Sequence, residues 1–447
     1  MPRKSAYKPS MKAVKKVEKK LKKKEENIDL SEMVPADNTF ANEMFAIIRA
    51  QNSELFEEYF KVESDGKISF ATLDDEGNTS LHYAAMGAMP GNSDAMFLAT
   101  LKGVKNKNPK DNKGLTPLHI AAMKGNLRIC ELIISSVKDK NPKEDTGRTP
   151  LHLAAVSGNL AVCRLIIRNV QEKNPSDPNG STPLHCAVSG GFLDICKFMI
   201  QNVKEKNPKD TNGMTPLHNA ATYGHFDIFK LISKEVKDIN PKDNDLSTPL
   251  HRAADIGHFK ICSLILKNVN EKNPKDKSGY TPLHFASQNG HLSVCQIIAE
   301  SMKDRNPSDE DGITPLHVSA RNGHLKVFLF ISEKLENINP KDGGDETPLH
   351  EAALNGHQEI CRKIIENVSD KNPKNNIGMT PLHHAARKGR VAEKHPENKS
   401  GDTPLDLETI FLLSIFFQPA FSCQFFPTFP VGTILEKALL RVQKYLL

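Results

Sequence analysis

The chain has 447 residues, a formal net charge of +6 and 28 prolines. Ten prolines lie in Thr-Pro pairs and nine in Asn-Pro pairs at regular spacing, so the proline content does not indicate disorder. The chain starts with a basic segment that lacks an apolar core, which excludes a secretory signal as the interpretation of these residues.

Residues 1–37 form a basic tail. Residues 3–26 hold ten Lys, one Arg and three Glu, a local charge of +8, which leaves −2 for the rest of the chain. This charge density predicts disorder. The lysines suit a solubilising tail, a nuclear import signal or a nucleic-acid-binding arm. We favour the first and disfavour nucleic acid, because no aromatic residue stands among the lysines of residues 15–24 to stack on bases.

Residues 38–78 differ in composition from the basic tail. Apolar side chains recur at helical spacing over residues 39–61, which predicts helices there.

Residues 79–402 are built from an internal repeat. Near-copies of Thr-Pro-Leu-His occur ten times, and eight of the nine intervals between their threonines are 33 residues long. Such a period is typical of a solenoid. The threonines are Thr79, Thr116, Thr149, Thr182, Thr215, Thr248, Thr281, Thr314, Thr347 and Thr380.

Each copy contains the residues of a helix start. In one copy, Thr281 suits the N-cap and Pro282 the first helical position, while His284 can reach back to the cap as Glu does in a capping box. Asp276 and Gly279 upstream are turn residues. A second apolar helix follows in each copy, so the units must stack to bury their apolar sides.

The recurring pattern Asp-x-x-Gly-x-Thr-Pro-Leu-His-x-Ala-Ala-x-x-Gly resembles the ankyrin repeat. The resemblance implies an all-α solenoid of stacked helix-turn-helix units, with β-hairpin fingers and first helices on a concave face and second helices on a convex back. Residues 79–402 would hold about nine full repeats and a truncated tenth, and residues 38–78 an N-terminal capping repeat. One departure recurs: Lys-Asn-Pro, as at residues 206–208, follows the second helix in place of the family's Gly-Ala, which leaves the exact end of that helix open.

Residues 403–447 hold the start of another repeat and then an apolar tail. Residues 409–435 are uncharged and contain seven phenylalanines. This length is sufficient for one membrane crossing, but Pro419, Pro427 and Pro430 interrupt it. We favour a segment that partly covers the last repeat, and the alternative is a membrane-anchored adaptor.

The residues that resemble catalytic or metal-binding groups have architectural explanations. Six cysteines share one repeat position, where Phe229 and Phe328 replace them in two copies, so we expect reduced core thiols. Most histidines belong to the repeated motifs. The sequence therefore predicts no catalytic residue, no cofactor and no metal site, and we expect a protein that is not an enzyme.

The family resemblance implies a binding scaffold. Reduced thiols indicate the cytoplasm, with nuclear entry through the lysine-rich tail as an alternative, and we expect a monomer. Partner recognition in the family uses the residues before Thr, after His and before Gly. Two further positions, on the fingers, belong to a row of lysines that favours an acidic protein partner. The predicted partner-binding residues are Arg252, Asp255, Tyr280, Phe285, Gln288, Ile313, Val318 and Arg321, with Lys242 and Lys275 on the fingers.

Overall fold

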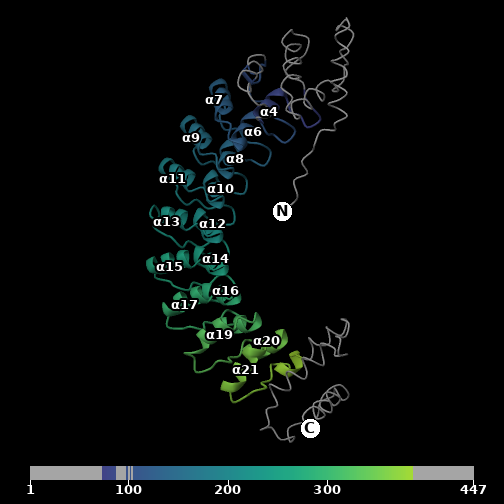
Figure 1. The fold of residues 1–447 in the computed structure, drawn as a ribbon, viewed down its shortest axis with the longest axis vertical. Coiled ribbons are helices and arrows are strands. Elements are labelled where there is room, and N and C mark those ends of the chain that lie inside the picture. Colours follow the sequence, from purple (N-terminus) through teal and green to yellow (C-terminus); the bar gives the residue numbers. More distant parts are fainter. Residues whose placement is uncertain (1–72, 87–96, 99–100, 102–103, 386–447) are drawn as a thin grey trace. The chain divides into compact units, whose positions relative to one another are not determined.

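The computed structural model describes residues 73–86, 97–98, 101 and 104–385 (Figure 1). The chain divides into two compact units between Val236 and Lys237. The predicted basic tail at residues 1–37, most of the capping repeat at residues 38–78 and the C-terminal segment at residues 403–447 lie outside the described residues.

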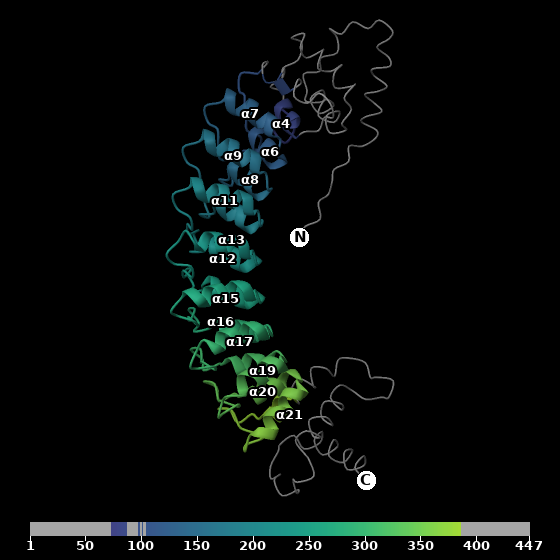
Figure 2. The same cartoon turned by 60° about the vertical axis from the view of Figure 1, so that its left-hand side comes forward.

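The first unit contains two rows of helices. The first helices of the repeats pack on one another in the order α4, α6, α8, α10, α12, and the second helices pack in the order α7, α9, α11, α13 (Figures 1 and 2). The first row comprises α4 (Ser80–Ala85), α6 (Pro117–Lys124), α8 (Pro150–Val156), α10 (Pro183–Ser189) and α12 (Pro216–Tyr223). The second row comprises α7 (Leu127–Ser136), α9 (Leu160–Asn169), α11 (Leu193–Asn202) and α13 (Phe226–Ser233).

The second unit repeats this arrangement. Its first-helix row comprises α14 (Pro249–Ile256), α16 (Pro282–Gln288), α18 (Pro315–Arg321) and α20 (Pro348–Asn355), and residues 381–385 are also helical. Its second-helix row comprises α15 (Phe259–Asn268), α17 (Leu292–Glu300), α19 (Leu325–Ser332) and α21 (Gln358–Asn367). The predicted all-α stack of helix pairs is confirmed.

The fingers are turns over the described residues, and the expected β-hairpins are not formed as strands. Each finger closes on itself, as where the Asp276 N–H donates to the Tyr280 carbonyl at 2.8 Å. Successive fingers are joined by isolated backbone bonds, such as Lys277 N–H to the Asp245 carbonyl at 2.9 Å. Isolated bonds of this kind do not build the continuous ladder that defines a strand.

The motif histidines link each repeat to the next one. In every described copy the backbone N–H of the motif Thr donates to the His Nδ1 three residues later, at 3.0–3.2 Å. Because an amide N–H can only donate, Nδ1 is unprotonated and Nε2 carries the hydrogen. The His284 Nε2–H donates across the repeat boundary to the Ile313 carbonyl at 3.0 Å. The predicted reach-back of His284 is confirmed, and the same ring also fastens two repeats together.

The Asn-Pro loops cap both flanking helices. The Asn273 side-chain oxygen accepts from the Leu283 N–H at 3.1 Å, and this amide has no partner within the first turn of α16. The Lys272 ammonium donates to the Val269 carbonyl at 2.6 Å and to the Leu266 carbonyl at the end of α15. Lys-Asn-Pro thus substitutes for the family's glycine, and α15 ends at Asn268.

The six cysteines at the shared repeat position are buried free thiols: Cys130, Cys163, Cys196, Cys262, Cys295 and Cys361. Burial raises the pKa of these thiols to about 12, which keeps them protonated and weakly reactive. Phe229 and Phe328 are 0% exposed at the same position, so the prediction of core residues is confirmed.

The loop cap is testable at Asn273. Asn273→Ala should lower the free energy of unfolding by about 1 kcal/mol, because the Leu283 amide loses its acceptor. Asn270→Ala, an exposed residue of the same loop, is the matched control. Urea unfolding of both variants measures the difference, and equal midpoints would contradict the capping role.

The buried histidines should make the stack sensitive to acid. Burial lowers the pKa of His119, His152, His251 and His284 from 6.5 to about 4. Between these values the unfolded chain binds protons that the folded chain does not, so stability is complete above pH 6.5 and falls as the pH drops toward 4. Each such His contributes up to about 1.4 kcal/mol per pH unit in that window.

His284→Gln measures the contribution of one histidine to this acid sensitivity, since Gln can also reach back to Thr281 but does not titrate. Urea midpoints measured at pH 7.5 and pH 5 should differ less for the variant than for the natural chain. An unchanged difference would refute the role of His284 in the acid sensitivity.

Candidate partner-binding surface

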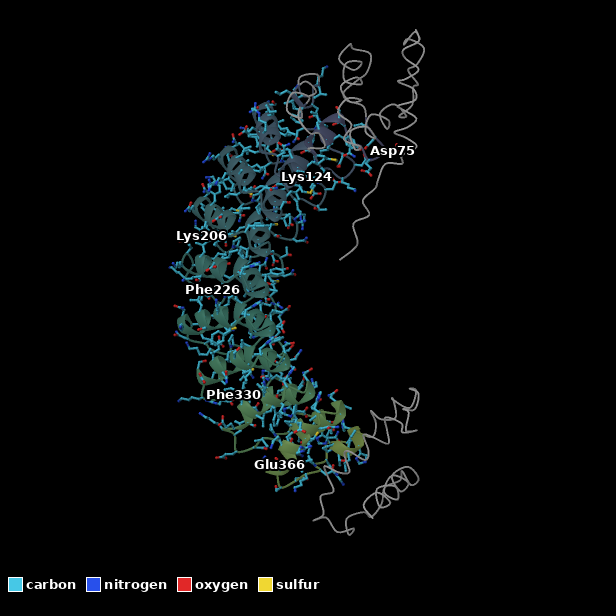
Figure 3. All side chains as sticks on the ribbon, in the orientation of Figure 1. Asp75, Lys124, Lys206, Phe226, Phe330 and Glu366 are labelled. Atoms are coloured by element: carbon cyan, nitrogen blue, oxygen red, sulfur yellow. The ribbon has the colours of Figure 1, made fainter. Side chains whose placement is uncertain are left out.

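The predicted partner-binding residues all lie in the second unit, on the fingers and first helices. Figure 3 shows the side chains and labels Phe330 of α19 and Glu366 of α21, which belong to the second-helix row. We call the surface made by the fingers and first helices of the second unit the first-helix face.

Tyr280 and Phe285 form an aromatic pair on this face. Their ring centroids lie 5.7 Å apart in an edge arrangement, and the Phe285 ring also lies 5.9 Å from the His251 ring, edge-on. The Tyr280 ring lies 4.9 Å from the His284 ring. Both side chains are half-buried, and burial raises the pKa of the Tyr280 hydroxyl. The pair is therefore held in place by neighbours and still offers apolar area to solvent.

The two flanking arginines are paired with carboxylates of the same unit. Arg252 Nη2 donates to Asp243 at 3.1 Å, within its own repeat. Arg321 binds Glu351 of the next repeat through two bonds of 2.9 and 2.6 Å, and these bonds raise the pKa of Arg321. Sequence reasoning missed both acidic partners. Glu351 follows the motif His of its repeat, as Phe285 does in its own repeat. Aligning the copies in register would therefore have placed Glu351 on the same face as Arg321.

The remaining predicted residues differ in exposure. Gln288 is exposed, Ile313 is half-buried, and the Asp255 carboxylate accepts from the Asn289 side chain at 2.9 Å. Val318 is only 1% exposed, which corrects its assignment to the partner surface. It packs inside the row because α18 lies against both α16 and α20.

The finger lysines are engaged within the protein. The Lys275 ammonium donates to the Ser308 carbonyl of the next finger at 2.7 Å, and Lys242 lies 4.0 Å from Glu271. Over residues 241–256, 274–289, 307–322, 340–355 and 373–385, eleven carboxylates stand against seven Lys and Arg, a net charge of −4. Glu310 and Asp311 are exposed among them. The first-helix face is acidic despite its lysines.

Two general features bear on the class of site. Within the described ranges, no three His, Cys, Asp or Glu side chains are grouped so that they could hold a metal ion. Among those same residues, no helix is both long and apolar enough to cross a membrane. Residues 409–435 lie outside them.

Comparison with known proteins locates the repeats independently. A family model described as ankyrin repeats (3 copies) matches residues 88–177, 165–245, 193–276, 235–307, 250–342 and 335–394. Alpha-latrotoxin-Lt1a of Latrodectus tredecimguttatus is 41% identical over 80 residues, which cover 18% of this chain and 5% of the toxin. The chain thus spans only a small part of the length of that relative.

Proposed function

Because the chain belongs to the ankyrin-repeat family, we propose that it is a non-enzymatic scaffold that holds a protein partner on the first-helix face of the second unit. Proteins built from these repeats are protein-binding scaffolds in general. The observation that carries the finer proposal is the aromatic pair of Tyr280 and Phe285. Aromatic side chains dominate binding energy at interfaces, and side chains already fixed by packing lose little freedom on binding.

The charge of the first-helix face supports a basic partner in place of the acidic one expected from the lysine row. All four of Lys242, Lys275, Glu310 and Asp311 are exposed, but the two lysines each lie beside an acceptor of the protein, Glu271 and the Ser308 carbonyl. A partner segment with Lys or Arg around an apolar anchor complements this pattern. The Arg252–Asp243 and Arg321–Glu351 pairs would border the anchor on its two sides.

We place the scaffold in the cytoplasm as a monomer. The six buried free thiols support a reducing compartment, where cysteines stay unpaired. Nuclear import through the lysines of residues 15–24 remains the alternative. Removal of residues 1–26 distinguishes the two, since only an import signal would make nuclear entry depend on that segment.

The aromatic anchor is testable by truncation at Phe285. Once a partner is captured with the full chain, Phe285→Ala should weaken its binding by about 1–2 kcal/mol, or roughly five- to thirtyfold in Kd. Phe259→Ala is the matched control, because Phe259 is 41% exposed but lies on the second-helix row. Calorimetric titration gives both affinities. Equal Kd values, or global unfolding caused by Phe285→Ala, would refute the anchor.

The charge assignment is testable on the fingers. Replacing Glu310 and Asp311 together by Lys should slow association with the partner and remove most of its salt dependence, since the attraction acts mainly on the encounter. Replacing Lys242 and Lys275 together by Ala should leave the association rate unchanged or raise it. Stopped-flow kinetics at two salt concentrations measures both. A slower rate for the lysine variant alone would restore the acidic partner.

A further inference from the structure

The helix α19 is apolar at a position where the other second helices are polar. Leu329 stands there in α19 and is 39% exposed. The residues at the same position of the other second helices are Glu131, Arg164, Lys197, Lys230, Ser263, Gln296 and Arg362. Among the second helices α7 to α21 named above, α19 alone is apolar at this solvent-facing position.

A second exchange extends the apolar surface. Ile338 occupies the loop position that Lys272 holds two repeats earlier, where the lysine caps carbonyls at the end of α15. In the α19 repeat this position is half-buried and carries no charge. The change therefore removes an ammonium group and adds apolar area beside Leu329.

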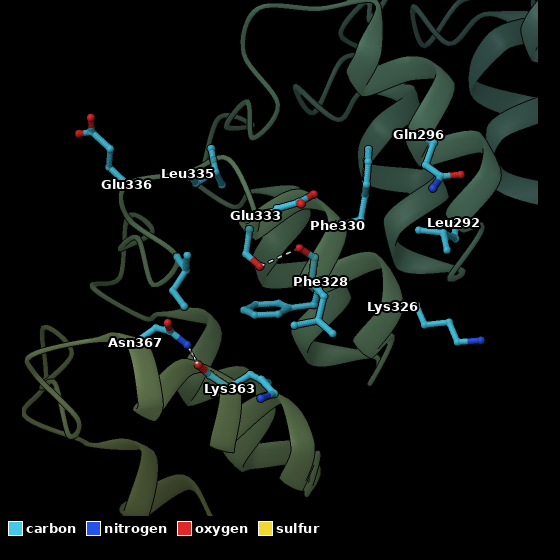
Figure 4. Close-up of a pocket in the computed structure, with 13 residues that line it drawn as sticks. Leu292, Gln296, Lys326, Phe328, Phe330, Glu333, Leu335, Glu336, Lys363 and Asn367 are labelled. Carbon is cyan, nitrogen blue, oxygen red and sulfur yellow. Dashed lines mark hydrogen bonds between the residues drawn. The ribbon is translucent and has the colours of Figure 1, made fainter.

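These residues line a hollow on the second-helix row (Figure 4). We call it the α19 hollow; its lining comes from α17, α19 with the loop that follows, and α21. The apolar side chains of the lining are Leu292, Phe328, Leu329, Phe330, Leu335 and Ile338. Phe328 is 0% exposed and lies at its base, while the Arg305 guanidinium lies 5.7 Å from the Phe330 ring.

The charged residues around the hollow do not favour a charged occupant. Lys326 and Lys363 are balanced by Glu333 and Glu336 in its lining. A strongly basic or acidic segment would meet as many like charges as opposite ones and would gain no net electrostatic attraction. An uncharged apolar segment does not need such attraction to bind. An exposed apolar surface with a polar rim is the usual mark of an interaction site.

We propose that the α19 hollow is the docking site of the chain's own apolar segment, residues 409–435. This segment is uncharged and carries seven phenylalanines, which suits a lining with six apolar side chains and balanced charges. Residues 386–408 connect it to the last described repeat, and 23 residues can span up to about 75 Å. The hollow includes Lys363 and Asn367 of α21, the last helix of the second row, so this reach is ample.

The proposal assigns the two surfaces of the second unit different occupants. The first-helix face, with its net charge of −4, is left for the partner, and the second-helix row covers apolar chain that would otherwise meet water. It does not depend on the proposed function, because it concerns the other helix row and a segment of the same chain.

Photo-crosslinking in the purified full chain tests the proposal. We would introduce p-benzoylphenylalanine at Leu329 and, as the matched control, at Phe259, which is similarly exposed on α15 of the same row. After irradiation, the monomer-sized band from the Leu329 position should yield peptides joined to residues 409–435, and the Phe259 position should not. Equal crosslinking from both positions, a crosslink only between two chains, or none to residues 409–435 would overturn the proposal.

A substitution provides the second measurement. Leu329→Glu restores the residue that Glu131 provides in α7, so the fold should tolerate it. Hydrogen exchange in residues 409–435 should become faster in this variant and stay unchanged in Phe259→Glu. Unchanged exchange in both variants would overturn the docking. The segment would be assigned to a membrane instead if the natural chain bound neutral lipid vesicles through residues 409–435 and if, without vesicles, hydrogen exchange in these residues were no slower than in Leu329→Glu.

Discussion

The neutral imidazole of the Thr-Pro-Leu-His motif is the contact on which the stack depends. One nitrogen accepts from the Thr amide at the start of its own first helix, and the other donates to the last finger carbonyl of the following repeat, as His284 does with Thr281 and Ile313. Both bonds require the uncharged ring in one tautomer. Burial lowers the pKa of the His284 ring, whereas its bond to the Ile313 carbonyl raises it. Burial is the larger effect, so the ring stays uncharged and keeps both bonds.

This use of the motif limits where recognition can occur. In the nine copies that start at Thr79 to Thr347 the four motif residues are buried, and the Asn-Pro loops serve to cap helices, so these positions carry no information about a partner. What remains is the residue after His, the finger residues and the solvent side of the second helix. In the second unit two such places carry large apolar side chains, Phe285 on one row and Leu329 on the other.

The local chemistry of this fold was predictable from sequence because it depends on spacing along the chain. The helix starts, the reach of His284 to its cap and the burial of the shared cysteine position all follow from residues close together in sequence. The partners of Arg321 and Lys275 were not predictable in this way, because Glu351 and Ser308 belong to the next repeats and the contacts depend on side-chain direction. The prediction that Val318 binds a partner was wrong for the same reason. Its position in the motif varies between copies, but the packing of α18 against α16 and α20 encloses it.

The residues that follow the motif histidines explain why we propose recognition on the second unit. In the first unit Tyr83 is 1% exposed and bonded to Asp74, and Ile120 is 4% exposed. Asn219 is bonded to Ser189 of the preceding repeat. These side chains are used within the stack, whereas the ring of Phe285 packs against Tyr280 and His251 and still keeps part of its surface in solvent. A side chain at this position serves recognition only when its neighbours fix it without enclosing it, and within the described first helices Phe285 combines an aromatic ring with that partial enclosure.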